Sequence, residues 1–378
     1  MSIAANCRLQ TFHGSKASMN DNDFLQQLGQ HIDHCSRTGR SVQIEGGGSK
    51  HFYGGPLAGE IVSMRAFSGI LEYEPTELVI TAKAGTLLSE IEATVASQRQ
   101  MLAFEPPRFG KNSTLGGVIA SGLAGPRRAT HGGVRDFVLG TTLMDGRGQV
   151  LHFGGTVMKN VAGYDVSRLL AGSMGCMGLL LDVSVKVLPI APMETTLRFE
   201  MSQEKFIAQF NHWLGDPLPI SASHWHAGQA FLRLSGAQAA VNEAVKKLSG
   251  EVLSEEAASA LWNSLRDQTH PFFNWTGDLY RLSLPATTEP VASEFETLLE
   301  WAGSQRWLRA PADSNPIKIQ AMANTLNGHA TLYHTPTPAK RAFAFTSPAP
   351  ALKSIQQKLK LEFDPAGIFN PGRMAPIF

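Results

Sequence analysis

The chain has 378 residues, 43% of them hydrophobic and 17% charged, a composition typical of a soluble protein with two or three domains and a sizeable core. Its formal net charge of +1 gives no sign of a nucleic-acid or acidic-membrane partner. The three cysteines, Cys7, Cys35 and Cys176, form no Cys-x-x-Cys pair. We therefore expect no disulfide, no iron–sulfur cluster and no structural zinc, and a reducing compartment.

The start of the chain lacks the apolar stretch of a secretory signal. No segment reaches the roughly 18 consecutive apolar residues of a membrane-spanning helix. These absences predict a cytoplasmic protein, which would lie at the inner face of the plasma membrane only through a complex with partner proteins.

The first half of the chain alternates strand and helix patterns. Apolar residues at helical spacing predict a helix over residues 24–35, capped by Asp21 or Asn22 and ended by Gly39. Thr86 is expected to cap a second helix. The sequence Asp-Gly-Arg-Gly at 145–148 is typical of a hairpin turn. Further helices are predicted at 115–123 and 166–170, and strands at 41–45, 60–64, 78–83, 137–144, 149–153 and 179–188.

Glycine-rich loops become rarer after Pro192. Strands are predicted there at 195–201, 230–234, 279–284 and 329–333, and helices at 203–214, 237–248, 255–267, 291–301 and 352–361. This alternation predicts an α+β domain in which helices cover one face of an antiparallel sheet. We place one domain at 1–190, a second at 191–361 and a tail at 362–378.

Three loops of small residues stand out, at 45–50, 113–117 and 172–178. Glycine lets the backbone approach a ligand closely, and successive N–H groups in a turn bind phosphate. Gly116 and Gly117 also stand at a predicted helix start, whose dipole favours an anion. One such loop is more often only a turn, and neither Gly-x-Gly-x-x-Gly nor P-loop spacing is present. The three loops together predict a site for a diphosphate ligand.

These loops, in this order and spacing, resemble the FAD-binding domain of the vanillyl-alcohol oxidase type, also called the PCMH type. Within that group the chain is similar to the FAD-binding subunits of glycolate oxidases. The resemblance extends over nearly the whole chain and is closest for 41–190. Its most specific segments are Gly-Pro-Arg-Arg at 125–128 and Lys-Asn-Val-Ala-Gly-Tyr-Asp at 159–165, with further matches at 104–110, 135–140 and 363–374.

The resemblance implies two α+β subdomains that hold FAD between them, a ferredoxin-like α+β cap domain, and a tail that returns to the flavin. Some relatives tether the flavin through a histidine in the first loop, whereas this loop offers Gly48 and Ser49, so non-covalent FAD is expected. The residues that match the family's cofactor contacts are Gly46, Gly47, Gly48, Ser49 and Lys50 at the diphosphate, Ser113, Thr114, Gly116 and Gly117 along the diphosphate and flavin, Gly175, Gly178 and Leu179 toward the adenosine, Tyr164 and Asp165 near the isoalloxazine, and Asn370 and Pro371 in the returning tail.

The resemblance also implies a function, with alternatives. In the first, FAD oxidises a small 2-hydroxy acid, glycolate to glyoxylate, and electrons pass to an iron–sulfur subunit, because this chain has no cluster ligands. In the second, the chain is a non-catalytic electron relay or structural subunit beside a homologous FAD subunit that carries a metal. The third, a free-standing oxidase or reductase of the same fold acting with NADPH, is disfavoured by the tail at 363–374.

Histidines offer two candidate metal sites. In the family, the homologous FAD subunits that carry a metal have a histidine-containing metal-binding motif. This chain has only a shortened counterpart of that motif, which contains His329 and His334. These two histidines are an odd number of positions apart on a predicted strand, so they would point to opposite faces, which argues against a working metal pair. His224 and His226 share one face of a predicted edge strand, but no third ligand is apparent.

Other side chains have more than one interpretation. Arg281 could bind a carboxylate as a bidentate fork or form a surface salt bridge. Arg127 and Arg128 could meet a phosphate, lie at a subunit contact or be solvated. Cys176 is expected to pack as a small apolar residue. An aromatic cluster, core or interface, is formed by Trp262, Phe272, Phe273 and Trp275.

Overall fold

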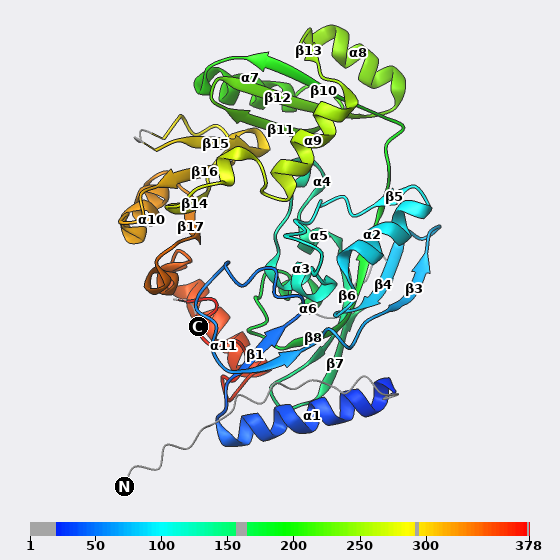
Figure 1. The fold of residues 1–378 in the computed structure, drawn as a ribbon, viewed down its shortest axis with the longest axis vertical. Coiled ribbons are helices and arrows are strands. Elements are labelled where there is room, and N and C mark those ends of the chain that lie inside the picture. Colours follow the sequence, from blue (N-terminus) through cyan, green and yellow to red (C-terminus); the bar gives the residue numbers. More distant parts are fainter. Residues whose placement is uncertain (1–19, 156–164, 292–294, 376–377) are drawn as a thin grey trace.

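The structure is a computed structural model that describes residues 20–155, 165–291, 295–375 and 378. Tyr164 lies outside the described residues. Figure 1 shows two lobes, one above the other. The lower lobe contains the residues up to about 190 together with the C-terminal helix, and the upper lobe contains those between. Within the described ranges, no helix has both the length and the apolar character needed to cross a membrane.

The lower lobe is an α+β unit with one larger sheet. Strands β3, β4, β8, β6 and β7 form it in that order, and each neighbouring pair is antiparallel. Strands β1 and β2 form a separate parallel pair. The elements of this part are α1 (Asp21–Thr38), β1 (Val42–Glu45), β2 (Glu60–Ser63), β3 (Ile70–Glu74), β4 (Val79–Lys83), α2 (Leu88–Ser97), β5 (Gln100–Met101), α3 (Leu115–Ser121), α4 (Arg128–His131), α5 (Val134–Phe137), β6 (Val138–Met144), β7 (Val150–Gly154), α6 (Val166–Leu169), β8 (Leu179–Lys186) and β9 (Leu188–Pro189).

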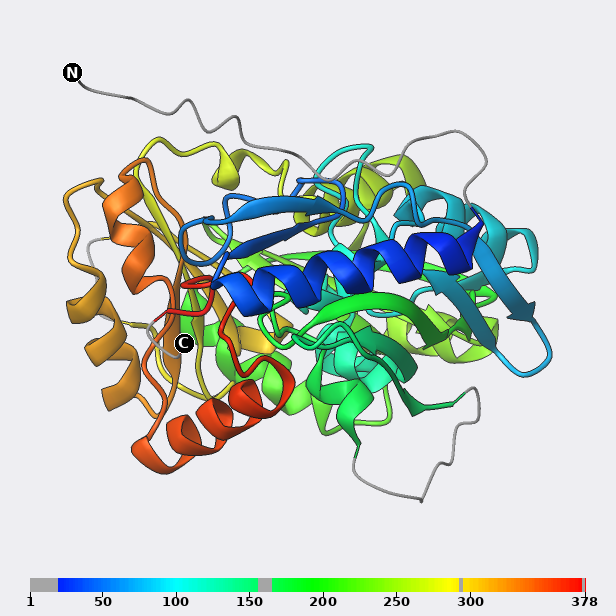
Figure 2. The same cartoon turned by 90° about the horizontal axis from the view of Figure 1, so that it is seen from below.

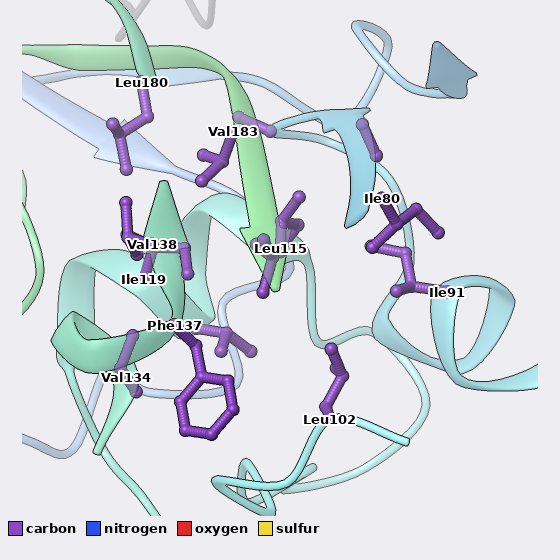
Figure 3. Packing of buried hydrophobic residues seen from close by; sticks show 14 of the residues in the cluster. Ile80, Ile91, Leu102, Leu115, Ile119, Val134, Phe137, Val138, Leu180 and Val183 are labelled. Atoms are coloured by element: carbon purple, nitrogen blue, oxygen red, sulfur yellow. The ribbon is translucent and has the colours of Figure 1, made fainter. Parts of the chain in front are cut away.

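The core of the lower lobe lies between this sheet and helices α2, α3 and α5. In Figure 3, Ile80 of the sheet lies beside Ile91 of α2, and Val183 of the sheet lies near Leu115 of α3. Burying side chains of this size stabilises the fold by roughly 1.5–3 kcal/mol each. The packing therefore fixes α3, whose first turn follows the second glycine loop. The predicted hairpin at 145–148 is confirmed, since it joins β6 to β7.

Two helix starts differ in detail from the sequence-based expectation. The cap of α1 is Asn20, not Asp21 or Asn22: its side chain accepts from the Asp23 amide at 2.9 Å. Thr86 does not cap α2, because its hydroxyl bonds both the amide and the carbonyl of Gly69, at 2.9 and 3.1 Å. In both cases the polar residue near the helix start has a better partner elsewhere.

The upper lobe is built on an eight-stranded sheet in the order β13-β10-β12-β11-β15-β16-β14-β17, with all neighbouring pairs antiparallel. Helices α7, α8 and α10 cover one face, as predicted. The other face packs against α9 and residues of the lower lobe, including Tyr53. The elements are β10 (Met193–Glu200), α7 (Gln203–Leu214), β11 (Ile220–His226), β12 (Gln229–Gly236), α8 (Gln238–Leu248), β13 (Glu251–Val252), α9 (Glu255–Arg266), η1 (Pro271–Phe273), β14 (Asp278–Ser283), β15 (Thr297–Glu300), η2 (Trp301–Gly303), β16 (Gln305–Ala310), α10 (Pro316–Thr325), β17 (His329–His334) and η3 (Pro338–Phe343).

Two predictions for this sheet are wrong. The helix predicted over 291–301 is replaced, among its described residues, by β15 and the short turn η2. Leu298 packs on the face of the sheet toward the lower lobe, and Leu299 packs on the opposite face. A strand that is buried on both faces has a continuous apolar run, which cannot be told from a buried helix by its pattern alone. Strand β11, with His224 and His226, is not an edge strand but lies between β12 and β15.

The last helix, α11 (Pro350–Phe363), packs on the lower lobe although the sequence groups it with the upper one. Phe363 belongs to the lower core, and Lys360 donates to the carbonyl of Cys176 at 2.6 Å. The tail then runs beside β1, where Val42 pairs with Phe369 in parallel fashion. The end of the chain thus lies next to its first strand.

Charged side chains join the two lobes. The carboxylate of Glu105 accepts from the amide and Nε of Arg127, at 2.8 and 3.1 Å, and from Nη2 of Arg233 in the upper lobe at 2.9 Å. Arg127 also pairs with Glu194. Burial alone would raise the pKa of Glu105, but the two guanidinium groups outweigh it and lower the pKa. Arg127 is therefore engaged in this contact between lobes rather than with a phosphate.

Candidate cofactor site

The three glycine loops, although far apart in the sequence, meet around one cavity together with the C-terminal tail. The cavity is partly open, and about 810 Å³ of space lies within it when the adjoining solvent is included. The predicted site residues that line it are Gly46, Gly47, Gly48, Ser49, Lys50, Thr114, Gly116, Gly117, Gly175, Gly178 and Asn370.

The first loop leaves β1 and packs directly on the second. A Cβ at Gly46 would stand 2.2 Å from Thr114 Oγ1, and one at Gly47 would stand 1.4 Å from the Asn112 carbonyl oxygen. Gly48 has a φ of +69°, which favours glycine. The first two glycines are therefore required for contact between the loops, and not only for the approach of a ligand.

The backbone amides of the first loop face no acceptor in the part of the chain that the structure describes. Among the hydrogen bonds of the described residues, none has an amide of residues 46–50 as donor. The start of α3 differs: the amides of Leu115 and Gly116 donate to Thr86 and Ala84 at 2.9 and 2.8 Å, and that of Gly117 to the Thr114 side chain. The first loop thus offers N–H groups to an anion, whereas α3 offers chiefly the positive end of its dipole.

Lys50 places a cation in the same wall of the cavity. Its Nζ donates to Ser113 Oγ at 2.8 Å and to Ser49 Oγ at 3.3 Å, and lies 5.6 Å from the centre of the Phe109 ring. Burial lowers the pKa of Lys50 to about 8. No described carboxylate forms an ion pair with it. Ser113 does not line the cavity itself and acts through this lysine.

Asn370 joins the tail to the first and third loops. Its Oδ1 accepts from the Ile44 amide at 2.8 Å, and its Nδ2 donates to the Met174 carbonyl at 2.7 Å. A Cβ at Gly175, which has a φ of +71°, would stand 2.6 Å from that Nδ2. Both ends of the amide are used by the protein, so Asn370 holds the wall of the cavity in place.

Some predicted residues do not reach the cavity. Leu179 is fully buried in the cluster under α1, and its neighbour Leu180 lines the cavity instead. Asp165 is exposed and caps α6, with an ion pair to Arg168 at 3.2 Å. Pro371 is not among the lining residues. Each residue is occupied elsewhere in the lower lobe.

Several lining residues were not predicted as site residues, among them His51 and Arg373. His51 directly follows the first loop, and its Nε2 lies 2.9 Å from Glu45 Oε2. Arg373 donates to the Gly55 carbonyl and, at 3.3 Å, to that of Lys50, and burial lowers its pKa to about 10. The tail motif contains Arg373, but only the fold brings it under the first loop.

The remaining candidates lie in the upper lobe. Arg281 donates to the Tyr53 hydroxyl at 3.1 Å and stacks beside Tyr53 and Tyr333, with no ion pair to a described carboxylate. His329 and His334 stand at the two ends of β17 and belong to no converging set of metal ligands among the described residues. Cys176, which is in the third glycine loop of the lower lobe, is buried, and burial raises the pKa of its thiol to about 11.

The histidines of β11 have a third neighbour. His270 lies edge-on to His224 and His226, with ring centres 5.5 and 5.6 Å apart. His224 is buried, which lowers its pKa well below the usual value, and His226 contacts Glu296 at 2.7 Å. Their ligand atoms do not converge on one point in the described part of the chain. Trp262 and Phe272 lie in the core that joins the lobes, whereas Trp275 is partly exposed.

A cavity with five unengaged amides, a buried lysine and an apolar floor fits a dinucleotide with a diphosphate. Comparison with known proteins defines the class. A family model described as an FAD binding domain matches residues 25–154. The fold is similar to that of p-cresol methylhydroxylase, with a TM-score of 0.66 and 14% identity over 93% of this chain and 87% of the other. The chain is thus a PCMH-type flavoprotein, and FAD is its cofactor.

Sequence relatives narrow this class. The chain is 43% identical to glycolate oxidase subunit GlcE of Escherichia coli (strain K12), over 93% of this chain and 97% of that protein. It is also 31% identical to glycolate oxidase subunit GlcD of Bacillus subtilis (strain 168), over 37% of this chain and 29% of that one. The chain belongs to the family of the GlcE subunit. It is an FAD-dependent oxidoreductase subunit of the class that acts on CH–OH groups.

Proposed function

We propose that this chain is the FAD-binding subunit of a 2-hydroxy-acid dehydrogenase complex that oxidises glycolate to glyoxylate and passes electrons to an iron–sulfur subunit. The identity with GlcE over nearly the whole chain supports the substrate. The absence of a Cys-x-x-Cys pair or other cluster motif from the sequence supports a separate electron-accepting partner. A second, homologous FAD subunit completes the complex.

The observation that carries this proposal is the first loop, whose amides at residues 46–50 have no acceptor among the described residues and lie beside the buried cation of Lys50. In this site, residues 46–50 hold the diphosphate, and Thr114, Gly116 and Gly117 run along it. Gly175 and Gly178 form the wall toward the adenosine. Bound FAD supplies a two-electron acceptor, while the chain positions it, neutralises its phosphates and excludes water.

The cofactor is held without a covalent bond. His51 is the nearest histidine to the first loop, but its ring is engaged with Glu45. Denaturing the purified yellow protein in acid tests this: the flavin should leave with the supernatant. Flavin that stays with the precipitated protein would show a tether.

Arg281 is proposed to bind the substrate carboxylate. Its guanidinium lies 5.7 Å from the centres of two adjacent tyrosine rings, without an ion-pair partner among the described residues, and its fork matches a carboxylate in geometry. Tyr53, to which it donates, follows the first loop closely in the chain.

One observation favours a second function, that of an electron relay or structural FAD subunit. His329 and His334 lie at opposite ends of β17, so the shortened metal motif assembles no metal site within the described residues. The decisive experiment mixes the purified, FAD-loaded chain with glycolate without oxygen. Bleaching of the flavin absorbance supports oxidation by this chain. A spectrum that stays oxidised, with activity only after the partner subunits are added, supports the relay.

We also propose that the functional units follow the division at about residue 190. Residues 1–190 then hold the cofactor, the upper lobe forms the cap, and residues 362–378 close the site. The packing of Phe363 and Phe369 against lower-lobe residues supports the role of the tail.

A further inference from the structure

Three side chains that commonly bind metal ions converge on the outer side of the lower lobe. They are His31 and Cys35 of α1 and Glu60 of β2, and one ligand atom from each lies within 4.8 Å of the others. This is the one such group found among the described residues. Figure 2 shows α1 running along the outside of the lobe, and none of these three residues is among those that line the cofactor cavity. The group is therefore separate from the cofactor site.

The backbone brings these residues together. His31 and Cys35 are four residues apart, so they share one face of α1. That face is anchored by Leu28 and Ile32, which are fully buried against β1 and β2. Glu60 opens β2, where its amide donates to the Ser41 carbonyl at 2.8 Å. Rigid elements thus place all three side chains.

The distances match those expected around a tetrahedral zinc ion. With zinc–ligand bonds of about 2.0–2.3 Å, neighbouring ligand atoms stand about 3.4–3.6 Å apart. His31 Nε2 lies 3.7 Å from Cys35 Sγ and 3.6 Å from Glu60 Oε1. The nitrogen–oxygen distance is too long for a good hydrogen bond, but it suits two atoms that share an ion.

The chemistry of the group also favours zinc. Thiolate, imidazole and carboxylate are its usual ligands in proteins. Cys35 is fully buried, whereas the side chains of His31 and Glu60 are 19% and 20% exposed, which leaves a path for the ion and room for a water ligand. Zinc binds the deprotonated thiol, so its binding would release a proton from Cys35.

We propose that His31, Cys35 and Glu60 bind one Zn²⁺ ion, with water as the fourth ligand, and that this ion joins α1 to β2. The lack of a Cys-x-x-Cys pair predicts no structural zinc, but a site that uses a single cysteine with a histidine and a carboxylate needs no such pair. Only the parallel pairing of β1 and β2 brings Glu60 under the helix.

The experiment uses the full-length, untagged, FAD-loaded protein. It is treated with a chelator and then dialysed against increasing concentrations of zinc sulfate, and zinc and FAD are measured per chain. We expect one zinc ion per chain. Loss of a residue that only hydrogen-bonds to a metal ligand typically weakens metal binding by ~10–100-fold. Cys35→Ser and His31→Gln each remove a ligand, so each should weaken zinc binding by at least this factor. His34→Gln is the matched control, since this histidine of the same helix is exposed and outside the group.

A measurement on the unmodified protein keeps the test independent of how the variants fold. Cobalt(II) in place of zinc should give the intense visible bands of a tetrahedral site, at wavelengths beyond the flavin absorbance, and zinc should remove them by competition. FAD content reports whether each variant is folded. The proposal is overturned if the wild-type protein takes up no zinc and shows no such bands. Zinc affinity in Cys35→Ser equal to that of His34→Gln would overturn it equally.

Discussion

Lys50 is a buried cation in the wall of the cofactor site. It is a cation in a place where burial opposes charge, and its pKa is about 8. Hydrogen bonds to Ser113 and Ser49 hold the ammonium group in the cavity wall, and neither partner is an anion. An incoming diphosphate would supply the missing negative charge. The site without cofactor therefore carries an unfavourable charge that binding relieves.

This arrangement predicts that FAD affinity depends on pH. Above the pKa of about 8, the free protein loses the Lys50 charge, so FAD binding must take up a proton and should weaken by up to about tenfold per pH unit. Titrations that follow flavin fluorescence from neutral pH through about 9 would measure this. Lys50→Arg is the control, because arginine keeps its charge and its profile should stay flat. Equal slopes for the two proteins would contradict the assignment.

Ser49 offers a cleaner test of the phosphate cradle than the glycines do. Any side chain at Gly47 would collide with the Asn112 carbonyl, so Gly47→Asp would disturb the loop packing whatever its charge. Ser49→Asp instead adds a carboxylate to a lining residue, and we expect it to lower FAD affinity by about tenfold or more through charge repulsion. Ser49→Asn, of nearly the same shape, should retain most of the bound flavin. If both variants bind FAD alike, the diphosphate lies elsewhere.

Arg281 permits a test of the substrate site. Removing a charged hydrogen-bond partner typically costs about 1.5–3 kcal/mol, so Arg281→Met should lower kcat/KM for glycolate by about 10–100-fold in the complete complex. The loss should appear chiefly as a raised KM, with FAD content unchanged. Arg281→Lys should recover part of the activity but not the fork geometry. An unchanged KM in Arg281→Met would rule out this role.

At the scale of elements, sequence patterns predict most helices and strands, but they do not predict every segment against which an element packs. The hairpin of β6 and β7 and the start of α3 follow from local turn and cap residues, so they are predictable. Strand β15 is not, because Leu298 and Leu299 are buried on opposite faces by two different lobes. His51 and Arg373 were missed for a similar reason: their place in the cavity depends on contacts between residues distant in the sequence.

The two hydrogen bonds by which Asn370 of the tail holds the cavity wall can be tested by substitution. Asn370→Ala leaves the Ile44 amide and the Met174 carbonyl without their partners, each at a cost of about 1–3 kcal/mol. Asn370→Asp keeps the acceptor for Ile44 but sets a carboxylate oxygen against the Met174 carbonyl in a buried place, so it should be at least as destabilised as Asn370→Ala. Urea unfolding and the rate of FAD release would measure both. A stability equal to that of the wild type in Asn370→Ala would contradict the positioning role.

At the scale of the whole molecule, Glu105 links the two lobes through Arg127 and Arg233. Breaking a buried ion pair by removing one partner costs about 3–5 kcal/mol, so Glu105→Gln should strongly lower the free energy of unfolding. Glu92→Gln removes the partner of the more exposed Arg108 and should cost less than about 1 kcal/mol.

The same contact has a pH dependence of known sign. Because the pKa of Glu105 is lowered in the folded state, its stabilisation is complete above the ordinary carboxyl pKa and is lost as pH falls through the lowered value. The difference in stability between wild type and Glu105→Gln should therefore shrink in acid. A difference that grows on acidification would show that Glu105 does not act as a carboxylate.

The pairing of Phe369 with Val42 has a consequence for biosynthesis. The first strand leaves the ribosome long before the segment around Phe369, which completes the wall around the flavin. Flavin loading must then wait until that segment has been made. A message truncated before Asn370 would yield a colourless product even if both lobes folded.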